Sequence, residues 1–495
     1  MEFIGRKKEL IRLEQYYSSE HIQTCAIYGR RRCGKTSLVQ EFYKDKPHLS
    51  IDLQGTSAEG ILRQIADSLA EFTGKPRDRF REEIRDFSDL IGFLKTLEPE
   101  KKLIVFLDEL PDAVEKLDEV ASLLKKYIDD RLKKQNVFLI VCGSSISGML
   151  KEINGEDRPL FQRFPVQLRL RPLSYPESRL FHPEFDEADK IRAYSIASGI
   201  PQYHLLLKGP SLEDSIKENF MGDIAPLRLE SDSFLAREFT SWTVHERVIS
   251  AIANGANTLK VIAEKASMSK TNCSDILRRL ELVDIVERRI PYGKSEKSTT
   301  FRIIDGFVSF QYEVINRNLS LAKSDNVDVA YDLMREDILS FYGHRFEDVC
   351  MQYLRDTRIC SWTGNWEGRV PMQDIDGSVM KDESGHVMTE DVDIDLVAKV
   401  VDGEATRITA GECKFTRRRS GAGEYRELVR RASHAIKDSD NIRYIMFSRS
   451  GFTDELVEMA EDRPGLHLEL VTLDDISAWA ENKTRKPSQQ PYKGA

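Results

Sequence analysis

A glycine-rich loop between an apolar run and a helical pattern constrains this chain more than any other feature. The run at 25–28 leads into Gly29-Arg30-Arg31-Arg32-Cys33-Gly34-Lys35-Thr36, which fits GxxxxGK[ST], and then into Ser37 and a helical pattern. The glycines let the backbone curl, so that successive N–H groups and the helix start point at a phosphate. The segment predicts a strand, a phosphate-binding loop and a helix. Lys35 then reaches the terminal phosphates, and Thr36 offers its hydroxyl to Mg²⁺.

The three arginines of this loop, Arg30 to Arg32, are unusual there, and solvated charge is as good an interpretation of them as direct contact with phosphate. A second apolar run, 103–107, ends in Asp108 and Glu109, which predicts the other half of a magnesium site. Asp108 is expected to hold Mg²⁺ through water, and Glu109 to polarise the attacking water. A third run, 138–142, is followed by Gly143 and Ser144. Ser144 is either a sensor of the γ-phosphate or part of an ordinary turn.

The spacing of apolar runs and helical patterns predicts the fold class and the domains. Residues 1–170 alternate short apolar runs with charged helical stretches, which indicates an α/β fold with a parallel sheet covered by helices. Residues 171–238 have a helical pattern, and 239–315 combine three short helices with a turn-rich segment. A helical linker, 316–340, then leads to a mixed α/β region, 341–482, and to a tail at 483–495 that we expect to be disordered.

Composition limits the classes of function. Lys and Arg total 73 against 82 Asp and Glu, so the formal net charge of -9 excludes a uniformly basic polyanion binder. The 7 cysteines are scattered without a CxxC pair, which favours a reducing cytoplasm over a disulfide framework or a zinc knuckle. The start of the chain has no signal-peptide pattern and the apolar runs are short, so we expect no membrane partner.

Four separated motifs, taken in order, resemble the archaeal-type AAA+ ATPases of archaea and bacteria. They lie at 3–10, 28–36, 107–109 and 199–203, within a region of about 1–235. The resemblance implies that ATP and Mg²⁺ are bound and that ATP is hydrolysed, with Ile4, Gly5 and Arg6 against the adenine and 199–203 in a helical lid. It also makes Arg163 a candidate finger that acts in trans, which would need a homo-oligomer; a plain surface arginine is the alternative.

Residues 239–315 resemble a winged helix-turn-helix, with a recognition helix at 270–281 and a wing that follows it. Between 241 and 300 there are 10 Lys and Arg against 7 Asp and Glu, a local excess of positive charge. Winged helices also dock proteins, so a structural role is the alternative to DNA contact. The residues expected to contact DNA are Lys270, Thr271, Asn272, Ser274, Arg288 and Arg289.

Alternation along 390–398 places Asp391, Asp393 and Asp395 on one face of a strand, where three carboxylates repel unless a cation lies among them. Glu412 and Lys414 share a face of the following strand. A hairpin with a two-residue loop sets Asp393 opposite Glu412, whereas a four-residue loop ending at 405 sets Asp395 opposite Glu412. Either register suits a divalent cation with oxygen ligands, with Lys414 orienting or activating a water.

This acid followed by Glu-x-Lys resembles the PD-(D/E)XK nuclease superfamily, which has a restriction-endonuclease-like fold. The resemblance covers about 340–480 and implies Mg²⁺ or Mn²⁺ held by Asp395 and Glu412, with Asp393 replacing or assisting Asp395. A helix around 345–350 would supply one more acid, Glu347. The sequence departs from the family pattern because the family commonly has Glu where Asp393 stands and no Pro-Asp dipeptide precedes it. A degenerate domain that binds without cutting is the alternative.

Together these patterns predict a protein that hydrolyses ATP and couples its nucleotide state to DNA binding and metal-dependent DNA cleavage. The alternative is an ATP-dependent DNA-binding regulatory switch whose nuclease-like domain is inactive.

Overall fold

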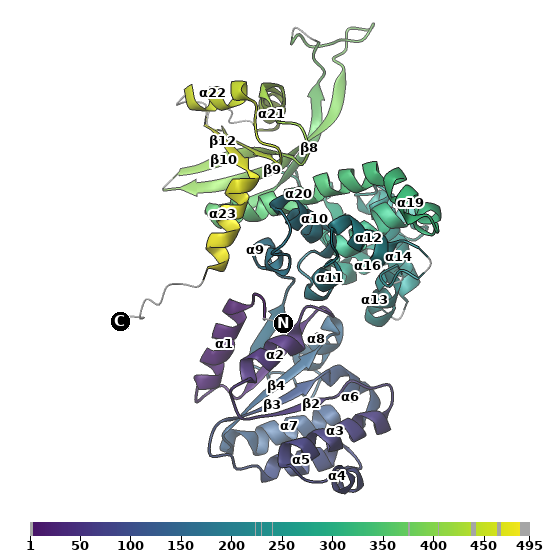
Figure 1. Cartoon of the computed structure of the whole chain (residues 1–495), viewed down its shortest axis with the longest axis vertical. Helices are drawn as coiled ribbons and strands as arrows, with labels where there is room; N and C mark the ends of the chain where they lie inside the picture. Colours follow the sequence, from purple (N-terminus) through teal and green to yellow (C-terminus); the bar gives the residue numbers. More distant parts are fainter. Residues whose placement is uncertain are drawn as a thin grey trace. The chain divides into compact units, whose positions relative to one another are not determined.

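The computed structural model describes residues 3–222, 224–228, 230–239, 241–374, 377–403, 405–436, 442–462 and 467–485, so most of the expected C-terminal tail lies outside the described residues. The chain divides into two compact units (Figure 1). The first comprises Met1–Leu173 with Gly199–Gln202, and the second comprises Ser174–Ser198 with Tyr203–Ala495. The lid helices expected at 171–238 therefore belong mainly to the second unit.

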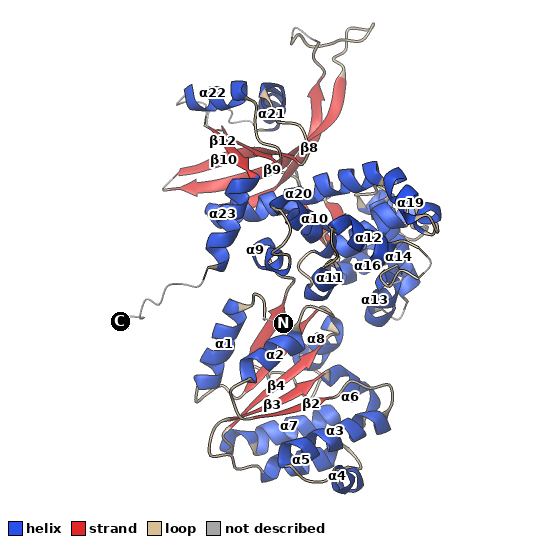
Figure 2. Ribbon diagram, viewed as in Figure 1, coloured by secondary structure: helices blue, strands red, loops and turns tan. Residues whose placement is uncertain are grey.

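The first unit is built on a five-stranded parallel sheet with the strand order β2-β3-β4-β1-β5 (Figure 2). Its strands are β1 (Thr24–Gly29), β2 (His48–Asp52), β3 (Leu103–Asp108), β4 (Val137–Gly143) and β5 (Val166–Leu170). Every residue of β1, β3 and β4 is buried, as expected for inner strands of a sheet covered on both faces. The predicted α/β fold of this region is confirmed.

Helices flank this sheet (Figure 2). They are α1 (Lys7–Ser18), α2 (Lys35–Tyr43), α3 (Ala58–Thr73), α4 (Arg77–Glu83), α5 (Phe87–Thr96), α6 (Leu110–Lys116), α7 (Val120–Asp130) and α8 (Ile146–Asn154). The edge strands β2 and β5 were not among the predicted strands. Each carries polar residues between apolar ones, so neither forms a continuous apolar run.

The second unit begins with helices and ends with a mixed sheet. Its first helices are α9 (Tyr175–Ser178), α10 (Glu187–Ala197), α11 (Pro201–Leu206, which starts in the first unit), α12 (Leu212–Phe220) and α13 (Glu230–Glu238). Three more helices and a two-stranded antiparallel hairpin follow, in the order expected from the sequence. These are α14 (Trp242–Ala253), α15 (Leu259–Lys265), α16 (Lys270–Leu282), β6 (Val286–Arg289) and β7 (Thr300–Ile303).

Four helices then lead to the C-terminal sheet: α17 (Gly306–Phe310), α18 (Leu319–Ala322), α19 (Val327–Leu333) and α20 (Arg335–Thr357). The domain boundary expected at 340 lies inside α20. The sheet has the order β12-β11-β10-β9-β8, with β8 to β10 antiparallel and β10 to β12 parallel. Its elements are β8 (Cys360–Pro371), β9 (Thr389–Asp402), β10 (Ala405–Lys414), α21 (Ala422–Ala435), β11 (Ile442–Ser448), α22 (Asp454–Asp462), β12 (Leu468–Thr472) and α23 (Leu473–Thr484).

All 7 cysteines lie in the described part of the chain as free thiols. Among the described residues, no helix is both long and apolar enough to cross a membrane.

Candidate functional site

The glycine-rich loop connects β1 to α2, as its sequence predicts. Gly34 precedes α2 with φ of 82°, and no side chain caps the helix, so its first N–H groups remain available to an anion. Gly29 ends β1 beside β5, where a Cβ atom would lie 2.3 Å from the Leu170 carbonyl oxygen. Glycine is therefore required at both positions, at one by conformation and at the other by close packing.

Lys35 and Thr36 lie where a phosphate and its cation would be held. The Lys35 ammonium is buried and donates to the carbonyl oxygens of Gly29 at 3.0 Å and Arg30 at 3.2 Å. Thr36 Oγ1 donates to Asp108 Oδ2 at 2.6 Å, which joins the loop to the end of β3. A hydroxyl and a carboxylate so close are suitable oxygen donors for Mg²⁺, so these residues fit the expected cation. Mg²⁺ would offset the phosphate charge there.

The two acids at the end of β3, Asp108 and Glu109, each accept a hydrogen bond from a backbone N–H group. Burial raises the pKa of Asp108, although the hydrogen bond from Thr36 opposes the shift. Glu109 has φ of 53°, an uncommon conformation for a residue with a side chain, and its Oε2 accepts from the Ser144 N–H at 2.8 Å. Ser144 thus lies beside Glu109 at the end of β4, and it is the backbone of Ser144 that makes this contact.

The segment that precedes α1 reaches the phosphate loop through Arg6. This side chain is buried, and its Nη2 donates to the carbonyl oxygen of Cys33 at 3.1 Å. Ile4 and Gly5 are half-buried just before it. Within the loop, Arg30 is 2% exposed, so its charge is not solvated. The remaining predicted loop residues differ in exposure: Cys33 is buried, Arg31 and Arg32 are half-buried, and Thr36 and Ser37 are exposed.

Arg163 contacts its own unit. Its Nη2 lies 3.1 Å from Asp129 Oδ2, and its Nη1 donates to the carbonyl oxygen of Phe161 at 2.7 Å. A role in a neighbouring subunit would require these contacts to break. The finger, and the homo-oligomer that it needs, stay predictions.

A groove with basic walls lies between α15, α16 and the β6–β7 hairpin. Five of its residues are cationic and two are acidic: Lys260, Lys270, Arg278, Arg288 and Lys297, with Glu281 and Glu296. Ser274 also lines the groove, and the other residues predicted on the first turns of α16, Thr271 and Asn272, are exposed. Three of the predicted contacts with DNA, Lys270, Ser274 and Arg288, thus line one positively charged groove along α16.

Arg289 makes an ion pair within the chain, whereas Arg288 has none with the described residues. It bonds to Glu287, and burial followed by the charge of Arg302 lowers its pKa. Arg302 on β7 pairs with Asp348 of α20. The side chain of Arg289 is thus part of a charge network that joins the hairpin to α20, which is a structural reason to separate it from the groove residues.

The hairpin of β9 and β10 adopts the second of the two expected registers. Val401 pairs with Thr406 and Leu396 with Gly411, so the same register, continued by one residue, sets Asp395 opposite Glu412. Asp395 Oδ2 accepts from the Cys413 N–H at 2.7 Å. Helix α20 adds Glu347, and burial together with the charge of Asp395 raises the pKa of this carboxyl.

Glu412 is held by two cations of the protein itself. Its Oε1 lies 2.5 Å from Lys414 Nζ and its Oε2 lies 2.7 Å from Arg431 Nη2 of α21. Arg431 also donates to the backbone oxygen of Asp393 at 2.7 Å, while the Asp393 side chain is 66% exposed. The described residues hold no group of three or more His, Cys, Asp or Glu side chains placed to bind a metal ion. A metal ion held by Asp395, Glu412 and Glu347 therefore stays a prediction, and Glu412 would have to exchange its contacts with Lys414 and Arg431 to bind one.

Sequence reasoning missed the role of Arg431 as the counter-ion of Glu412. The signal was its position on α21, because Leu428 and Ala432 on the same face are buried. An arginine on the apolar face of a helix needs a buried partner, but the acids nearest to Arg431 in the sequence are Glu424 and Glu427 of α21 itself, so the pattern did not single out Glu412.

Comparisons with known proteins agree with this geometry. A model described as an ATPase domain predominantly from Archaea matches residues 3–207, and one of archaeal and bacterial proteins of unknown function matches residues 311–425. The uncharacterized protein MJECL04 of Methanocaldococcus jannaschii is 28% identical over 355 residues, which are 71% of this chain and 77% of that protein. The uncharacterized ATP-binding protein MJ0423 of the same organism is 41% identical over 44 residues, 9% of this chain and 75% of that protein.

Two solved structures are also similar. The Walker-type ATPase PABY2304 of Pyrococcus abyssi aligns with a TM-score of 0.48 and 18% identity, over 63% of this chain and 96% of that one. The ORC2 protein of Aeropyrum pernix, in ADPNP and ADP complexes, aligns with a TM-score of 0.42 and 13% identity, over 68% of this chain and 95% of that one. Residues 3–207 are thus similar to an ATPase domain found predominantly in Archaea, and this match together with the loop geometry supports binding and hydrolysis of ATP.

Proposed function

We propose that the chain is an ATP-driven switch that binds DNA, with hydrolysis in residues 3–207 controlling a winged helix-turn-helix at 241–303. The basic groove along α16 is the observation that carries this proposal, because a helix and a hairpin that share positive charge suit a DNA duplex. Because the chain as a whole has a net negative charge, its overall composition does not account for this local excess of cations.

A short segment supports communication between the two units. Gly199–Gln202 belongs to the first unit, whereas the residues before and after it belong to the second. In the first unit, the Leu173 N–H donates to the Gly199 carbonyl oxygen at 2.8 Å, and Pro201 Cγ lies 3.8 Å from the Cβ position of Gly34. A shift of the phosphate loop on hydrolysis would therefore act on a segment whose two ends continue into the second unit.

The ATPase part of the proposal is tested by Lys35→Ala and Glu109→Gln in the full chain. Lys35→Ala is expected to abolish ATP binding, because it removes the ammonium held over the loop. Glu109→Gln is expected to retain ATP binding and to lose at least about 100-fold in hydrolysis, since the amide cannot accept a proton from water. Normal hydrolysis by both variants would refute the assignment of this site.

The DNA part is tested by the salt dependence of duplex binding. Lys270→Ala and Arg288→Ala are each expected to lower the slope of log affinity against log salt by about 1. Lys265→Ala is the control, since Lys265 lies on α15 outside the groove and donates to the Asn254 carbonyl oxygen. Equal slopes for the groove variants and the control would contradict a DNA-binding groove. Loading with a non-hydrolysable ATP analogue is expected to change the affinity of the unaltered chain.

Metal-dependent cleavage of DNA is a second candidate function. The register that sets Asp395 opposite Glu412, with Lys414 on the same strand and Glu347 nearby, favours it. The two cations that hold Glu412 oppose it, so the regulatory switch is the better supported of the two. Plasmid nicking with Mg²⁺ or Mn²⁺ separates them: cleavage that is lost in Glu412→Ala establishes the nuclease, and no cleavage at either metal leaves the switch.

A further inference from the structure

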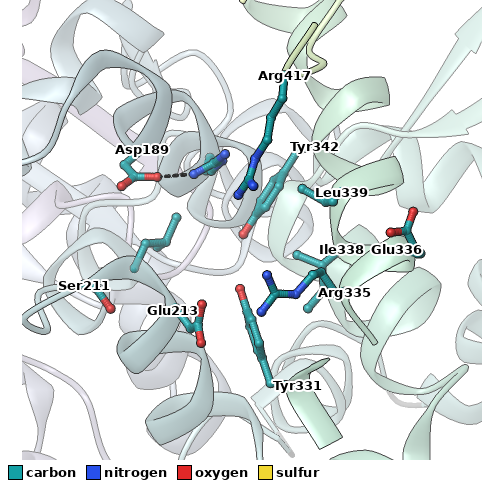
Figure 3. Close-up of a pocket in the computed structure, with 12 residues that line it drawn as sticks. Asp189, Ser211, Glu213, Tyr331, Arg335, Glu336, Ile338, Leu339, Tyr342 and Arg417 are labelled. Atoms are coloured by element: carbon teal, nitrogen blue, oxygen red, sulfur yellow. Dashed lines mark hydrogen bonds and ion pairs between the residues drawn. The ribbon is translucent and has the colours of Figure 1, made fainter. Parts of the chain in front are cut away.

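A pocket of about 420 Å³ lies within the second unit, and none of its residues belongs to the phosphate loop or to the groove along α16. Its walls come from α10, the start of α12, α19, α20 and the segment after β10 (Figure 3). The lining residues that matter below are Asp189, Arg192, Glu213, Tyr331, Arg335, Tyr342 and Arg417. Pockets of this size commonly hold small molecules.

Two tyrosines with largely buried side chains present their hydroxyl groups to this pocket. Tyr342 is 3% exposed and Tyr331 is 8% exposed, and both hydroxyls face the middle of the pocket (Figure 3). Within the described residues neither hydroxyl has a hydrogen bond. Both hydroxyls are open to the pocket and are therefore available to a ligand. A ligand that accepts hydrogen bonds would supply partners for them.

Arg417 brings an uncompensated positive charge to the same place. The neighbouring arginines after β10 and on α21 all pair with acids: Arg418 with Glu424, Arg419 with Asp454, Arg426 with Glu455, Arg430 with Glu390 and Arg431 with Glu412. Arg417 has no acidic partner among the described residues, and its side chain extends toward Tyr342 (Figure 3). Arg335 points into the pocket from the opposite wall, but it already pairs with Asp332 of α19.

The acids of the pocket do not neutralise Arg417, because two of them already have partners. Asp189 accepts from Arg192 at 2.5 Å, and Glu213 lies 2.8 Å from Lys217 Nζ. A third acid, Glu336, is exposed. Close by, burial and then the charges of Arg192 and Arg417 lower the pKa of Arg449, while Asp186 and Asp189 oppose the shift. An anion among these three arginines would relieve their repulsion.

We infer that this pocket binds the phosphate group of a small phosphorylated molecule of about mononucleotide size. Arg417 supplies positive charge to the phosphate oxygens, Arg335 lies on the opposite wall in an ion pair with Asp332, and the Tyr331 and Tyr342 hydroxyls donate hydrogen bonds to the phosphate. Ser211 and Glu213, near the start of α12, lie on another wall and suit the hydroxyl or amino groups of the rest of the molecule. A cavity enclosed by five segments of the chain admits a small ligand more readily than a duplex.

Such a ligand would act close to the acids of β10. Arg417 follows Lys414 by three residues, and Phe415 between them lies under the guanidinium groups of Arg192 at 5.9 Å and Arg449 at 5.2 Å. Binding would therefore fix the segment after β10 against α10, which precedes Gly199–Gln202 in the chain. This assigns the pocket a place between the lid helices and the C-terminal sheet.

The test uses full-length protein carrying Lys35→Ala, so that the phosphate loop does not contribute to binding. Inorganic phosphate and adenosine monophosphate are titrated by calorimetry into this protein and into versions that add Tyr342→Phe, Arg417→Ala or Arg418→Ala. Tyr342→Phe keeps the ring and removes only the hydroxyl, and Arg418→Ala is the control because Arg418 pairs with Glu424 at 3.0 Å.

Binding of either probe that weakens at least about tenfold with Tyr342→Phe and with Arg417→Ala, but less than about twofold with Arg418→Ala, supports the inference. Phosphate alone binding as well as the nucleotide would mark a phosphate site, and preference for the nucleotide would mark a nucleotide site. Binding of neither probe at millimolar concentration would overturn the inference. Equal binding of the probes by all versions would also overturn the inference. It would be overturned as well if Arg417→Ala weakened the binding of single-stranded DNA but of neither small probe.

Discussion

We expect the buried ion pair between Glu412 and Arg431 to have a larger coupling energy than an exposed pair of the same type, because burial removes the charges from water. The two side chains are 3% and 9% exposed and lie 2.7 Å apart. On the same helix, Arg426 lies 2.9 Å from Glu455, but these side chains are 67% and 62% exposed. The two pairs share chemistry and distance, so a difference in their coupling energies would report the effect of removing charges from water.

The expected magnitude follows from the surroundings of Glu412. Two unit charges about 3 Å apart attract by about 5 kcal/mol at an effective dielectric constant of about 20. Lys414 shares the same carboxylate and would compensate part of the loss when Arg431 is replaced. We therefore expect a coupling energy of about 3 kcal/mol for the buried pair, and below about 0.5 kcal/mol for the exposed pair.

The assay is a double-mutant cycle in the full chain with Glu412→Gln, Arg431→Met and their combination. Glu455→Gln and Arg426→Met form the control cycle. Because the chain has more than one unit, the free energy of opening is measured locally, by hydrogen exchange of β10 peptides in increasing urea. A coupling energy below about 1 kcal/mol for Glu412 and Arg431, or one equal to the control, would refute the conclusion that this pair holds the acid cluster together.

Other predictions concern glycine packing and buried histidines. Gly29→Ala would place a methyl group 2.3 Å from the Leu170 carbonyl oxygen, so it is expected to destabilise the first unit by about 2 kcal/mol and to weaken ATP binding. Gly92→Ala on α5, with open space at its Cβ position, should stabilise the first unit by up to about 1 kcal/mol. Equal changes in the melting temperature for Gly29→Ala and Gly92→Ala would contradict the packing argument. His182 and His204 are fully buried, and burial lowers their pKa values to about 3 and about 4. As the pH falls, the unfolded chain protonates these histidines at a higher pH than the folded chain does. Each histidine should therefore lower the free energy of unfolding by about 2 kcal/mol at pH 5 relative to pH 7.5. In urea unfolding, the stability of the double variant His182→Gln/His204→Gln should depend less steeply on pH.

The elements that the sequence predicted best are those with a single local cause. The strand, loop and helix around Lys35 follow from glycine positions and an apolar run, and the structure has them at those residues. The hairpin of β9 and β10 follows from alternation, and only its register was open, because both turn lengths kept the acids on one face. The mixed edge strands β2 and β5 were missed because polar residues interrupt their apolar pattern.

Contacts between segments far apart in the sequence could not be predicted in this way. Arg431 and Glu412 are separated by 19 positions, and Arg302 and Asp348 by 46, so neither pair shows in a local pattern. The same holds for the pocket, whose hydroxyls come from α19 and α20 while Arg417 follows β10. Charge runs such as 417–419 look alike in sequence, yet only the folded chain shows that Arg418 and Arg419 have acidic partners.

The packing of the first lid helices bears on how ATP could act at a distance. Tyr175 of α9 stacks on Trp479 of α23 with ring centres 6.2 Å apart, and its N–H donates to Gln352 of α20 at 2.9 Å. Arg179, just after α9, pairs with Glu187 of α10 at 2.6 Å and donates to Ser477 of α23 at 3.0 Å. These buried contacts tie the lid helices to the C-terminal sheet as one body. Under the proposed switch, a nucleotide that moves Gly199–Gln202 would act on helices that contact α20 and α23, and Glu347 lies on α20.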